Sequence, residues 1–453
     1  MSKDKSEVKN LLYRILMLAV PAAIENILDT LVQYVDAAMV GRLGEKATAT
    51  VSISTSVTWL IGCPMYAAAV GIVAMISKAD GEGNREKIKT VANLATWSTI
   101  VIGLIELVIT LLISPYVPVL MGAEKDLHKL ASLYFFIICT PMLFRCALTT
   151  LAGAIRGLGD TKTPMFITFL MNFINIILDY IFIYLCGYGV IGAAVATAIS
   201  FTVGGIAMYI CFINKMKLER SELLRMPAKS AVSECLKTGV PSALGSIVSC
   251  TGYVVFAALV SGMGTVIFAA HSLAVTAEML FYMAGHGIQA AVATLSGFFL
   301  GRRDEKAFNK MMKYSAVLMI GLQIVNGILL FIFAYPLMSL FTPNEEVMRL
   351  GADMLKLVAF SEPFFGLTMV YKGSFMGLGL TKEPFYIDLI GMWGIRILST
   401  FICVKLLAMS LTAVWGCMIA DNVAKCLMVM GLFFYMKSAG KLFKINTKEV
   451  AEG

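Results

Sequence analysis

Residues 166–185 read FITFLMNFINIILDYIFIYL, a run of twenty residues with a single charge, that of Asp179. About twenty apolar residues are what a helix needs to cross a hydrocarbon core of roughly 30 Å. A charged side chain inside such a helix costs about 2.5–3.5 kcal/mol on insertion scales, and it usually marks an ion or substrate pathway. The segment therefore predicts a membrane-spanning helix that carries a functional acid.

The composition extends this prediction to the whole chain. Hydrophobic residues make up 58% of the 453 positions and charged residues only 15%, which is far more apolar than a soluble domain. No segment shows the alternating pattern of a membrane β-barrel, so we expect an all-α integral membrane protein. Twelve transmembrane helices are predicted, at 11–40, 50–76, 90–113, 129–152, 164–185, 190–213, 235–260, 268–298, 311–335, 348–371, 384–407 and 412–436.

The distribution of Lys and Arg predicts the orientation. If both termini are cytoplasmic, the cytoplasmic segments hold 27 of the 37 Lys and Arg, and the opposite segments hold five. Loops rich in these residues stay in the cytoplasm. We therefore expect a multi-pass protein of the cell (plasma) membrane with both termini in the cytoplasm. The net charge of +8 follows from this topology and gives no reason to expect nucleic-acid binding.

The chain repeats itself at an offset of 220 residues. VPAAI at 20–24 returns as VPSAL at 240–244, and GAIRGLGDTKTPMF at 153–166 returns as GSFMGLGLTKEPFY at 373–386. Six spans in each half make two parallel six-helix bundles, related by a pseudo-two-fold axis along the membrane normal, around a central cleft. The predicted division is an N-terminal lobe at 1–213 that holds a cation-coupling site, a cytoplasmic linker at 214–234, and a C-terminal lobe with a cytoplasmic tail at 235–453.

Polar residues on three spans of the N-terminal lobe predict one site. Asp179 lies four residues after Asn175, so both share one face of the fifth helix. With a rise of about 1.5 Å per residue, Asp36, Asp179 and Thr197 all lie roughly 8–10 Å below the outer face of the membrane. We therefore predict a single polar pocket lined by Asp36, Asn175, Asp179 and Thr197.

Two uses of this pocket and one structural alternative are open. Carboxylate, amide and hydroxyl oxygens suit a hard ion such as Na⁺, whereas two neighbouring acids could equally hold a proton. The alternative is a hydrogen-bond network that only joins three helices. The repeat argues against it, because the positions 220 residues further on carry neither acid; they are Phe256, Ile395, Ser399 and Cys417.

A second group of polar residues is predicted to face the cleft. Glu278, Tyr282 and Gln289 lie near one face of the eighth span, and Gln33 and Tyr34 of the first span join them as substrate-cleft candidates. An acid that faces the cleft could attract a cationic substrate. The structural alternative is that Glu278 pairs with another side chain inside its own lobe.

Motifs for other functions are missing from the sequence. There is no P-loop, so we do not expect this chain to bind ATP, and no HExxH or paired-acid constellation predicts an enzyme. The ten cysteines contain no CxxC pair. We therefore expect a monomer that uses no cofactor beyond H⁺ or Na⁺ and whose partners are small amphipathic molecules and the lipid bilayer.

Four segments and one proline resemble a known family: VDAAMVGRLG at 35–44, NIILDY at 175–180, GAAVATAIS at 192–200, AAHSLA at 269–274, and Pro21 in the first span. They are similar to the multidrug and toxic compound extrusion (MATE) family over nearly the whole chain. The resemblance implies a twelve-helix antiporter with two six-helix lobes that uses an inward Na⁺ or H⁺ gradient to export amphipathic, often cationic compounds.

The resemblance also implies roles for particular residues. In the DinF-like branch of the family, the cation site of the N-terminal lobe falls on Asp36, Asn175, Asp179 and Thr197. The NorM-like branch adds a glutamate on the seventh helix, where this chain has Ser249, Cys250 and Thr251, so no ion site of that type is expected in the C-terminal lobe. A lipid-linked precursor flippase of the same superfamily is the alternative within transport, and a membrane-embedded enzyme is the alternative in another class.

Overall fold

The computed structural model describes residues 2–219, 222 and 225–443, and within these ranges every regular element is helical. This confirms the predicted all-α membrane fold. Nine described helices, some of them with short π-helical segments, are long and apolar enough to span a membrane. They are α1 (Ser2–Gly41), α4 (Arg85–Ile113), α8 with η2 (Lys162–Asp179 and Tyr180–Leu185), α9 (Gly189–Met216), α11 (Lys229–Ser261), α12 (Thr265–Arg302), α13 (Glu305–Phe341), α16 to η4 (Lys382–Leu389, η3 Ile390–Ile397, α17 Leu398–Phe401, η4 Ile402–Leu406) and α18 (Leu411–Ser438).

Three further predicted spans are bent pairs of helices in the described part of the chain. The pairs are α2 (Glu45–Ile61) with α3 (Cys63–Gly81), α6 (His128–Cys139) with α7 (Met142–Gly157), and α14 (Glu345–Val358) with α15 (Glu362–Gly377), and their bends are 42°, 46° and 55°. A proline lies at each break: Pro64, Pro141 and Pro363. Because proline lacks the backbone N–H and fits the first turn of a helix, a new helix begins there at an angle. The short α5 (Val117–Leu120) and η1 (Lys125–Leu127) precede α6.

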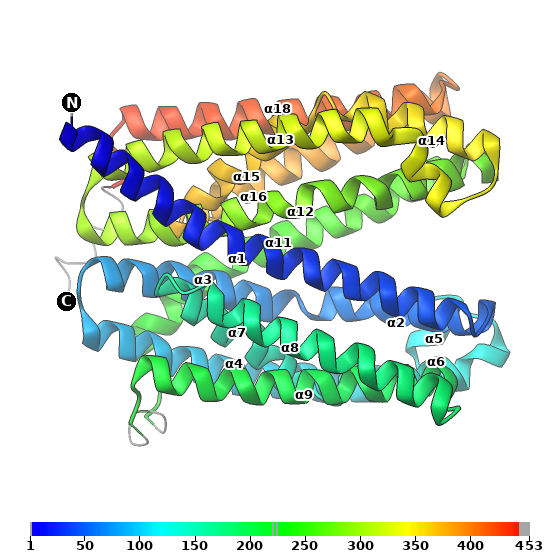
Figure 1. Cartoon of the computed structure of the whole chain (residues 1–453), viewed down its shortest axis with the longest axis horizontal. Helices are drawn as coiled ribbons and strands as arrows, with labels where there is room; N and C mark the ends of the chain where they lie inside the picture. Colours follow the sequence, from blue (N-terminus) through cyan, green and yellow to red (C-terminus); the bar gives the residue numbers. More distant parts are fainter. Residues whose placement is uncertain (1, 220–221, 223–224, 444–453) are drawn as a thin grey trace. The chain divides into compact units, whose positions relative to one another are not determined.

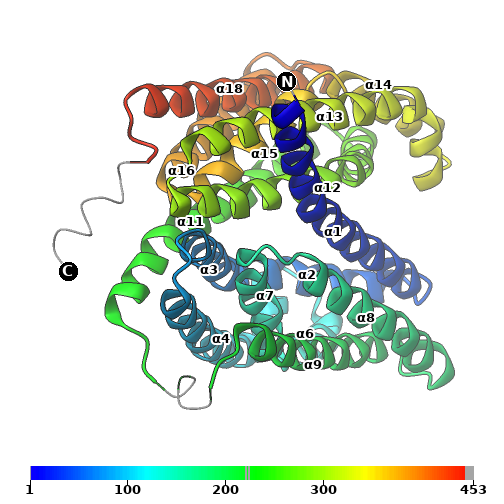
Figure 2. The ribbon, with the colours of Figure 1, turned by 60° about the vertical axis from the view of Figure 1, so that its left-hand side comes forward.

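The chain packs as two compact units. The N-unit is Ile24–Ala243, and the C-unit is Met1–Ala23 together with Leu244–Gly453. In the N-unit, α7 packs against α3, α4 and α9, and in the C-unit α12 packs against α13, α14 and α15 (Figures 1 and 2). The boundaries of the units fall inside α1 and α11, two residues after Pro21 and Pro241. The first half of each of these helices thus packs with the other half of the repeat.

We call the first halves of α1 and α11 the exchanged halves, because each packs in the unit of the other repeat. Each exchanged half is held by a close contact between a glycine and an alanine carbonyl. In the C-unit, a Cβ built on Gly287 of α12 would come within 2.3 Å of the Ala19 carbonyl oxygen of α1. In the N-unit, a Cβ built on Gly239 of α11 would come within 2.7 Å of the Ala67 carbonyl oxygen of α3. Adding 220 to Ala19 and Ala67 gives Gly239 and Gly287. The repeat seen in the sequence is therefore also a repeat of close backbone packing.

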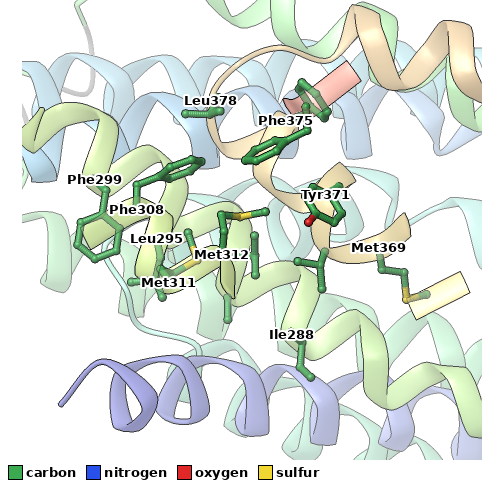
Figure 3. Close-up of a cluster of buried hydrophobic side chains, with 14 of the residues drawn as sticks. Ile288, Leu295, Phe299, Phe308, Met311, Met312, Met369, Tyr371, Phe375 and Leu378 are labelled. Carbon is green, nitrogen blue, oxygen red and sulfur yellow. The ribbon is translucent and has the colours of Figure 1, made fainter. Parts of the chain in front are cut away.

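The core of the C-unit lies between α12, α13 and α15, with the first half of α1 against it. Figure 3 shows part of this cluster, in which Leu295 and Phe299 of α12 lie beside Phe308 and Met311 of α13, while Ile288 lies further along α12. From α1, the cluster includes Leu11, Ile15, Leu18 and Ala19. Apolar burial of this kind is worth roughly 25 cal/mol per Å², so it holds the first half of α1 in the C-unit.

The GLGxTKxP connectors turn in the same way in both halves. Gly159 and Gly379 adopt left-handed backbone angles, with φ of +77° and +75°. Asp160, which has Leu380 as its counterpart, differs between the halves. Its carboxylate accepts hydrogen bonds from the backbone N–H of Lys162 and Thr163 at 3.1 and 3.0 Å and pairs with Lys215. Partial burial opposes ionisation, but Lys215 and Thr163 outweigh it, so the pKa of Asp160 lies below its ordinary value.

We expect Gly287→Ala to destabilise the protein by about 1–3 kcal/mol, because its methyl group would overlap the Ala19 carbonyl. The matched control is Gly321→Ala in α13, where no atom lies within 4 Å of the new Cβ. There the better helix propensity of alanine should leave stability unchanged or higher. Thermal unfolding of both purified variants tests this, and equal melting temperatures would contradict the close contact.

Asp160→Asn should lower the melting temperature at neutral pH. A carboxylate whose pKa is depressed by folding stabilises the protein above its unfolded pKa, and this stabilisation is lost as the pH falls through the folded pKa. The difference between variant and wild type should therefore shrink below roughly pH 4. Melting curves from pH 3 to 8 measure this difference in melting temperature. A difference that stays constant with pH would rule out stabilisation by the ionised Asp160 carboxylate.

Candidate functional site

A polar seam joins the second half of α1 to α8 in the N-unit. The Thr168 hydroxyl donates to Glu25 Oε1 at 3.3 Å, and Asn172 Nδ2 donates to Asp29 Oδ1 at 2.9 Å. The electrostatic contact between Asp36 and Asp179 keeps the same residue offset of 143. Because two α-helices rise equally per residue, a constant offset means that α1 and α8 run parallel and in register. The spacing of four and then seven residues on each helix keeps all these side chains on the facing surfaces.

Compensating positive charge decreases along this seam. Glu25 forms an ion pair with Arg156 of α7, 2.5 Å between Oε1 and Nη2. Asp29 accepts the amide hydrogen bond of Asn172. In the described part of the N-unit, no Lys, Arg or amide donates to Asp36 or Asp179. Positive charge is therefore most needed where these two acids meet.

The pair of Asp36 and Asp179 is the centre of the site. Their carboxyl groups lie within hydrogen-bonding reach of each other, and Asp179 is only 1% exposed while Asp36 is half-buried. Both oxygens of Asp179 and Oδ1 of Asp36 are buried and accept no hydrogen bond from the described residues. Ionised carboxylates without a partner are costly to bury. The pair is therefore suited to take up a proton or a small cation.

The other two predicted site residues lie on the neighbouring helices. Asn175 is buried one turn before Asp179 on α8, and its Nδ2 has no hydrogen-bond partner among the described residues. Thr197 is half-buried on α9, which packs against α8. Within the described ranges, no hydrogen bond joins the Thr197 hydroxyl to Asp179 or to Oδ1 of Asp36. The structure thus brings Asp36 and Asp179 together, and the role of Thr197 in the site stays a prediction.

Sequence reasoning missed three polar residues of the N-unit. Tyr134 of α6 is buried and lies within electrostatic range of both Asp36 and Asp179. Arg156 supplies the cation for Glu25, although its position in the repeat motif had suggested only a connector. Glu106 of α4 is 3% exposed, and neither of its carboxyl oxygens has a hydrogen-bond partner among the described residues. Glu106, a lone acid in an apolar span, carries the same signal as Asp179 and could have been found by it.

Three of the predicted cleft residues, Glu278, Tyr282 and Gln289, have neighbours within the C-unit. Glu278 of α12 is half-buried and interacts electrostatically with the buried Glu362 of α15. The ring of Tyr282 contacts that of Phe365, with 5.3 Å between centroids. Gln289 contacts His286, 3.1 Å between Oε1 and Nδ1. On α1, Gln33 is exposed and Tyr34 half-buried. Nothing in these contacts assigns a substrate to any of the five candidates, which stay predictions.

The comparisons with known proteins agree with this fold. A model of the MatE family matches residues 21–181 and 241–402, and a model named Lipid II flippase MurJ matches residues 157–264. The probable multidrug resistance protein NorM of Thermotoga maritima is 30% identical over 450 residues, which is 98% of this chain and 96% of that protein. The NorM homologue of Photorhabdus laumondii is 25% identical and covers 84% of this chain and 85% of its own.

Solved structures show the same fold at lower identity. A crystal structure of MATE in complex with MaL6 has a TM-score of 0.88 at 21% identity and covers 95% of this chain and 97% of its own. A mutant of the Vibrio cholerae MATE transporter VcmN also has a TM-score of 0.88, at 19% identity. The match covers 97% of this chain and 100% of the VcmN chain. The chain belongs to the MatE family, as its sequence motifs predicted, and it is a multi-pass membrane efflux transporter and not an enzyme.

Arg156→Met should destabilise the protein by about 2 kcal/mol, because it leaves the Glu25 carboxylate buried without a cation. The double variant Glu25→Gln with Arg156→Met should recover more than half of the lost melting temperature. As a matched control, Arg349→Met breaks an equally short but exposed pair with Glu345 and should cost at most about 1 kcal/mol. Additive effects of the Glu25 and Arg156 changes would contradict the pairing.

Proposed function

We propose that this transporter is an antiporter that couples inward movement of H⁺ or Na⁺ to export of amphipathic, often cationic compounds. The observation that carries the proposal is the buried pair of Asp36 and Asp179, which has no cation among the described residues of its unit. The multidrug resistance names of the NorM relatives support export of drugs and toxic compounds.

The proposed cycle uses the acid pair as the coupling site. In the state open to the outside, Asp36 and Asp179 take up the ion, with Asn175 and Thr197 as further oxygen ligands if the ion is Na⁺. A filled site removes the repulsion between the carboxylates and favours a different arrangement of α1 against α8. Export follows if substrate affinity is lower in that arrangement, since differential binding to two states is what couples two ligands.

The seam explains why α1 could respond to the ion. α1 is held to α8 by Thr168 and Asn172 at two levels, and the third level is the acid pair. Only this third level lacks a donor in the described structure. The two carboxylates therefore repel each other when they are ionised, and they attract when a proton or cation lies between them. Pro21, which weakens the helix close to the unit boundary, gives α1 a place to bend.

The orientation and the location are part of the proposal. The excess of Lys and Arg in the connectors on the side of both termini supports cytoplasmic termini, and the apolar spans support insertion in the plasma membrane. In this orientation the acid pair is reached from the outside, which suits an inward ion gradient. A monomer is sufficient for this cycle, because the coupling site is complete within one unit of one chain.

A lipid-linked precursor flippase is the second candidate function. It is favoured by the match of the flippase model to residues 157–264, which cover part of each unit. The match of the MatE model is longer and occurs in both halves. Efflux of small compounds therefore takes precedence, and failure of efflux under every gradient would favour the flippase.

Asp179→Asn and Asp36→Asn should each reduce gradient-driven efflux at least tenfold while the protein still inserts and purifies. The assay is efflux of a fluorescent lipophilic cation from proteoliposomes, with a pH gradient and a Na⁺ gradient imposed separately. The matched control is Asp353→Asn, which removes a largely exposed carboxylate of α14 and should transport like wild type.

The same assay on the wild-type protein identifies the coupling ion. Efflux driven by only one gradient identifies H⁺ or Na⁺ as the coupling ion. Retained gradient-driven efflux in both aspartate variants would refute the coupling site and leave Asp36 and Asp179 with a structural role.

A further inference from the structure

The C-unit contains a cavity of about 190 Å³ that the proposed coupling cycle does not use. It lies between α11, α12, α15, α16 with η3, and α18. A water molecule needs only about 10–15 Å³ of such space, so the cavity can admit a small organic molecule. One part of its wall is charged and another part is apolar, and both parts belong to the C-unit alone.

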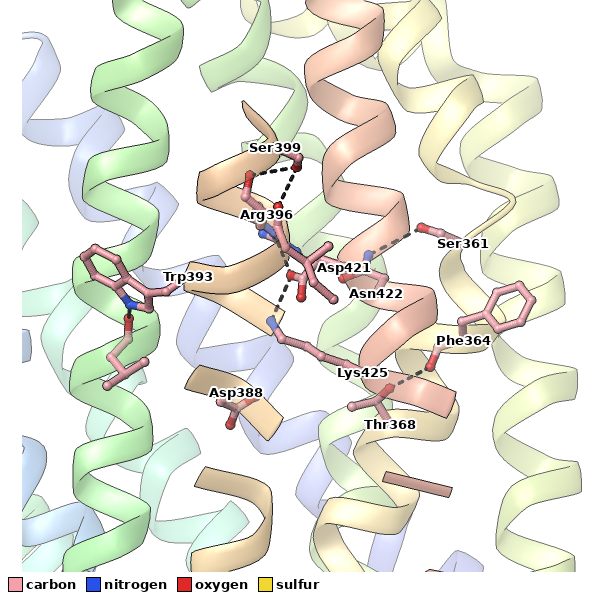
Figure 4. A network of polar contacts seen from close by, with 12 residues as sticks. Ser361, Phe364, Thr368, Asp388, Trp393, Arg396, Ser399, Asp421, Asn422 and Lys425 are labelled. Atoms are coloured by element: carbon pink, nitrogen blue, oxygen red, sulfur yellow. Dashed lines mark hydrogen bonds and ion pairs between the residues drawn. The ribbon is translucent and has the colours of Figure 1, made fainter. Parts of the chain in front are cut away.

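The charged wall contains two cations that pair with Asp421 of α18, which does not itself line the cavity. Arg396 Nε lies 2.8 Å and Lys425 Nζ 2.8 Å from the same oxygen, Asp421 Oδ2. Figure 4 shows these three side chains pointing toward one another from η3 and α18. Arg396 also donates to Asn422 Oδ1 at 3.1 Å. The side chains of Arg396, Lys425 and Asp421 are 4%, 11% and 0% exposed, so this is a buried cluster.

A third cation lies on the same wall. Lys372 of α15 pairs with Asp388 of α16, and both line the cavity with Arg396 and Lys425. Among the described ion pairs of this wall, three cations thus meet two acids, Asp388 and Asp421, which leaves one positive charge in excess. Glu278 lies within electrostatic range of Arg396 but forms no ion pair with it in the described part of the chain. Because a net buried charge is costly, the wall is suited to receive an anion.

The cluster is not part of the scaffold that the two halves share. Subtracting 220 from its five charged residues gives uncharged residues of the N-unit: Ala152, Thr168, Ile176, Phe201 and Gly205. Arg396 is placed by the π-helical segment η3, whereas the π-helical segment of α8 begins later, at Tyr180. π-Helical turns inside α-helices often mark functional sites. A need to hold a six-helix unit together therefore does not account for these charges.

The apolar wall determines what kind of anion fits. Tyr253, Phe365, Met369 and Met392 line the cavity beside the cations. Guanidinium groups bind carboxylates through two parallel hydrogen bonds, and aromatic and Met side chains accept flat apolar groups. A hydrated inorganic anion would leave these side chains unused.

We propose that this cavity is a binding site for an amphipathic organic carboxylate, with the carboxylate on Lys372, Arg396 and Lys425 and the apolar group against Phe365 and Met369. The inference rests on the proposed function only in naming this molecule as a second substrate class, beside the cationic compounds. Binding itself depends on the C-unit alone.

The test uses three probes of the same shape and different charge. Naphthalene-2-carboxylate is titrated by calorimetry into the full-length protein in lipid nanodiscs, beside the neutral 2-naphthalenemethanol and the cationic 2-naphthylmethylammonium. We expect the carboxylate to bind at least about tenfold more tightly than either of the other two. Equal binding of the alcohol would overturn the proposal, because the apolar wall alone would then explain the affinity.

Three variants test whether net charge decides binding. Lys372→Gln should weaken carboxylate binding at least tenfold, because the wall loses its excess charge. Lys372→Gln with Asp388→Asn restores the excess and should recover most of the affinity, which a general disruption of the fold would not allow. Lys356→Gln, which changes a half-exposed lysine of α14 that does not line the cavity, is the control and should bind like wild type. Unchanged binding in Lys372→Gln, or a double variant as weak as the single one, would overturn the proposal.

Failure of this site can be told apart from failure of the proposed antiport. The binding measurement needs no ion gradient, and Asp179→Asn, which lies in the N-unit, should bind the carboxylate like wild type while losing efflux. Loss of carboxylate binding in Asp179→Asn would place the ligand outside the C-unit cavity and overturn the proposal. Absence of efflux in the wild type, with carboxylate binding intact, would refute only the antiport.

Discussion

The cost of burying charge in a membrane protein governs this structure. Each buried ionised group needs a partner of opposite charge, a hydrogen-bond donor or a mobile ion. Glu25 has Arg156, Asp29 has Asn172, and Asp421 has Arg396 and Lys425. Asp36 and Asp179 have only each other among the described residues of their unit. The two proposed sites lie where this compensation is incomplete.

The excess buried charge has opposite signs in the two units. The seam of the N-unit carries the acids Glu25, Asp29, Asp36 and Asp179 against the one cation Arg156 in its described part. The wall of the C-unit cavity carries more cations than acids. Both are built on the same scaffold, as the equivalent contacts of Ala19 with Gly287 and of Ala67 with Gly239 show. The two halves therefore share their backbone packing and differ in their polar side chains, and function resides in such side chains and not in the fold.

The exchanged halves of α1 and α11 connect these sites to the scaffold. The first half of α1 is fixed in the C-unit by Leu11, Ile15 and Ala19, and its second half carries Asp36 in the N-unit. A change at Asp36 therefore acts on a helix that is anchored at its other end by a close backbone contact. α11 has the same construction but no acid at the position of Asp36, which is Phe256. A response to an ion is thus expected from only one of the two exchanged helices.

The sequence alone determined the membrane class, the twelve spans, the repeat and the family, because apolar length, composition and motif spacing are properties of the linear chain. It also placed Asp36 and Asp179 at one depth, since helical rise is fixed. It did not reveal the register of α1 against α8, the role of Arg156, the nearness of Tyr134 or the exchange of helix halves. Nor did it show that Arg396, Lys425 and Lys372 meet at one cavity. Those features depend on which helices pack together and how they are rotated, and only the tertiary structure decides that, because side-chain packing between distant segments leaves no fixed spacing in the sequence.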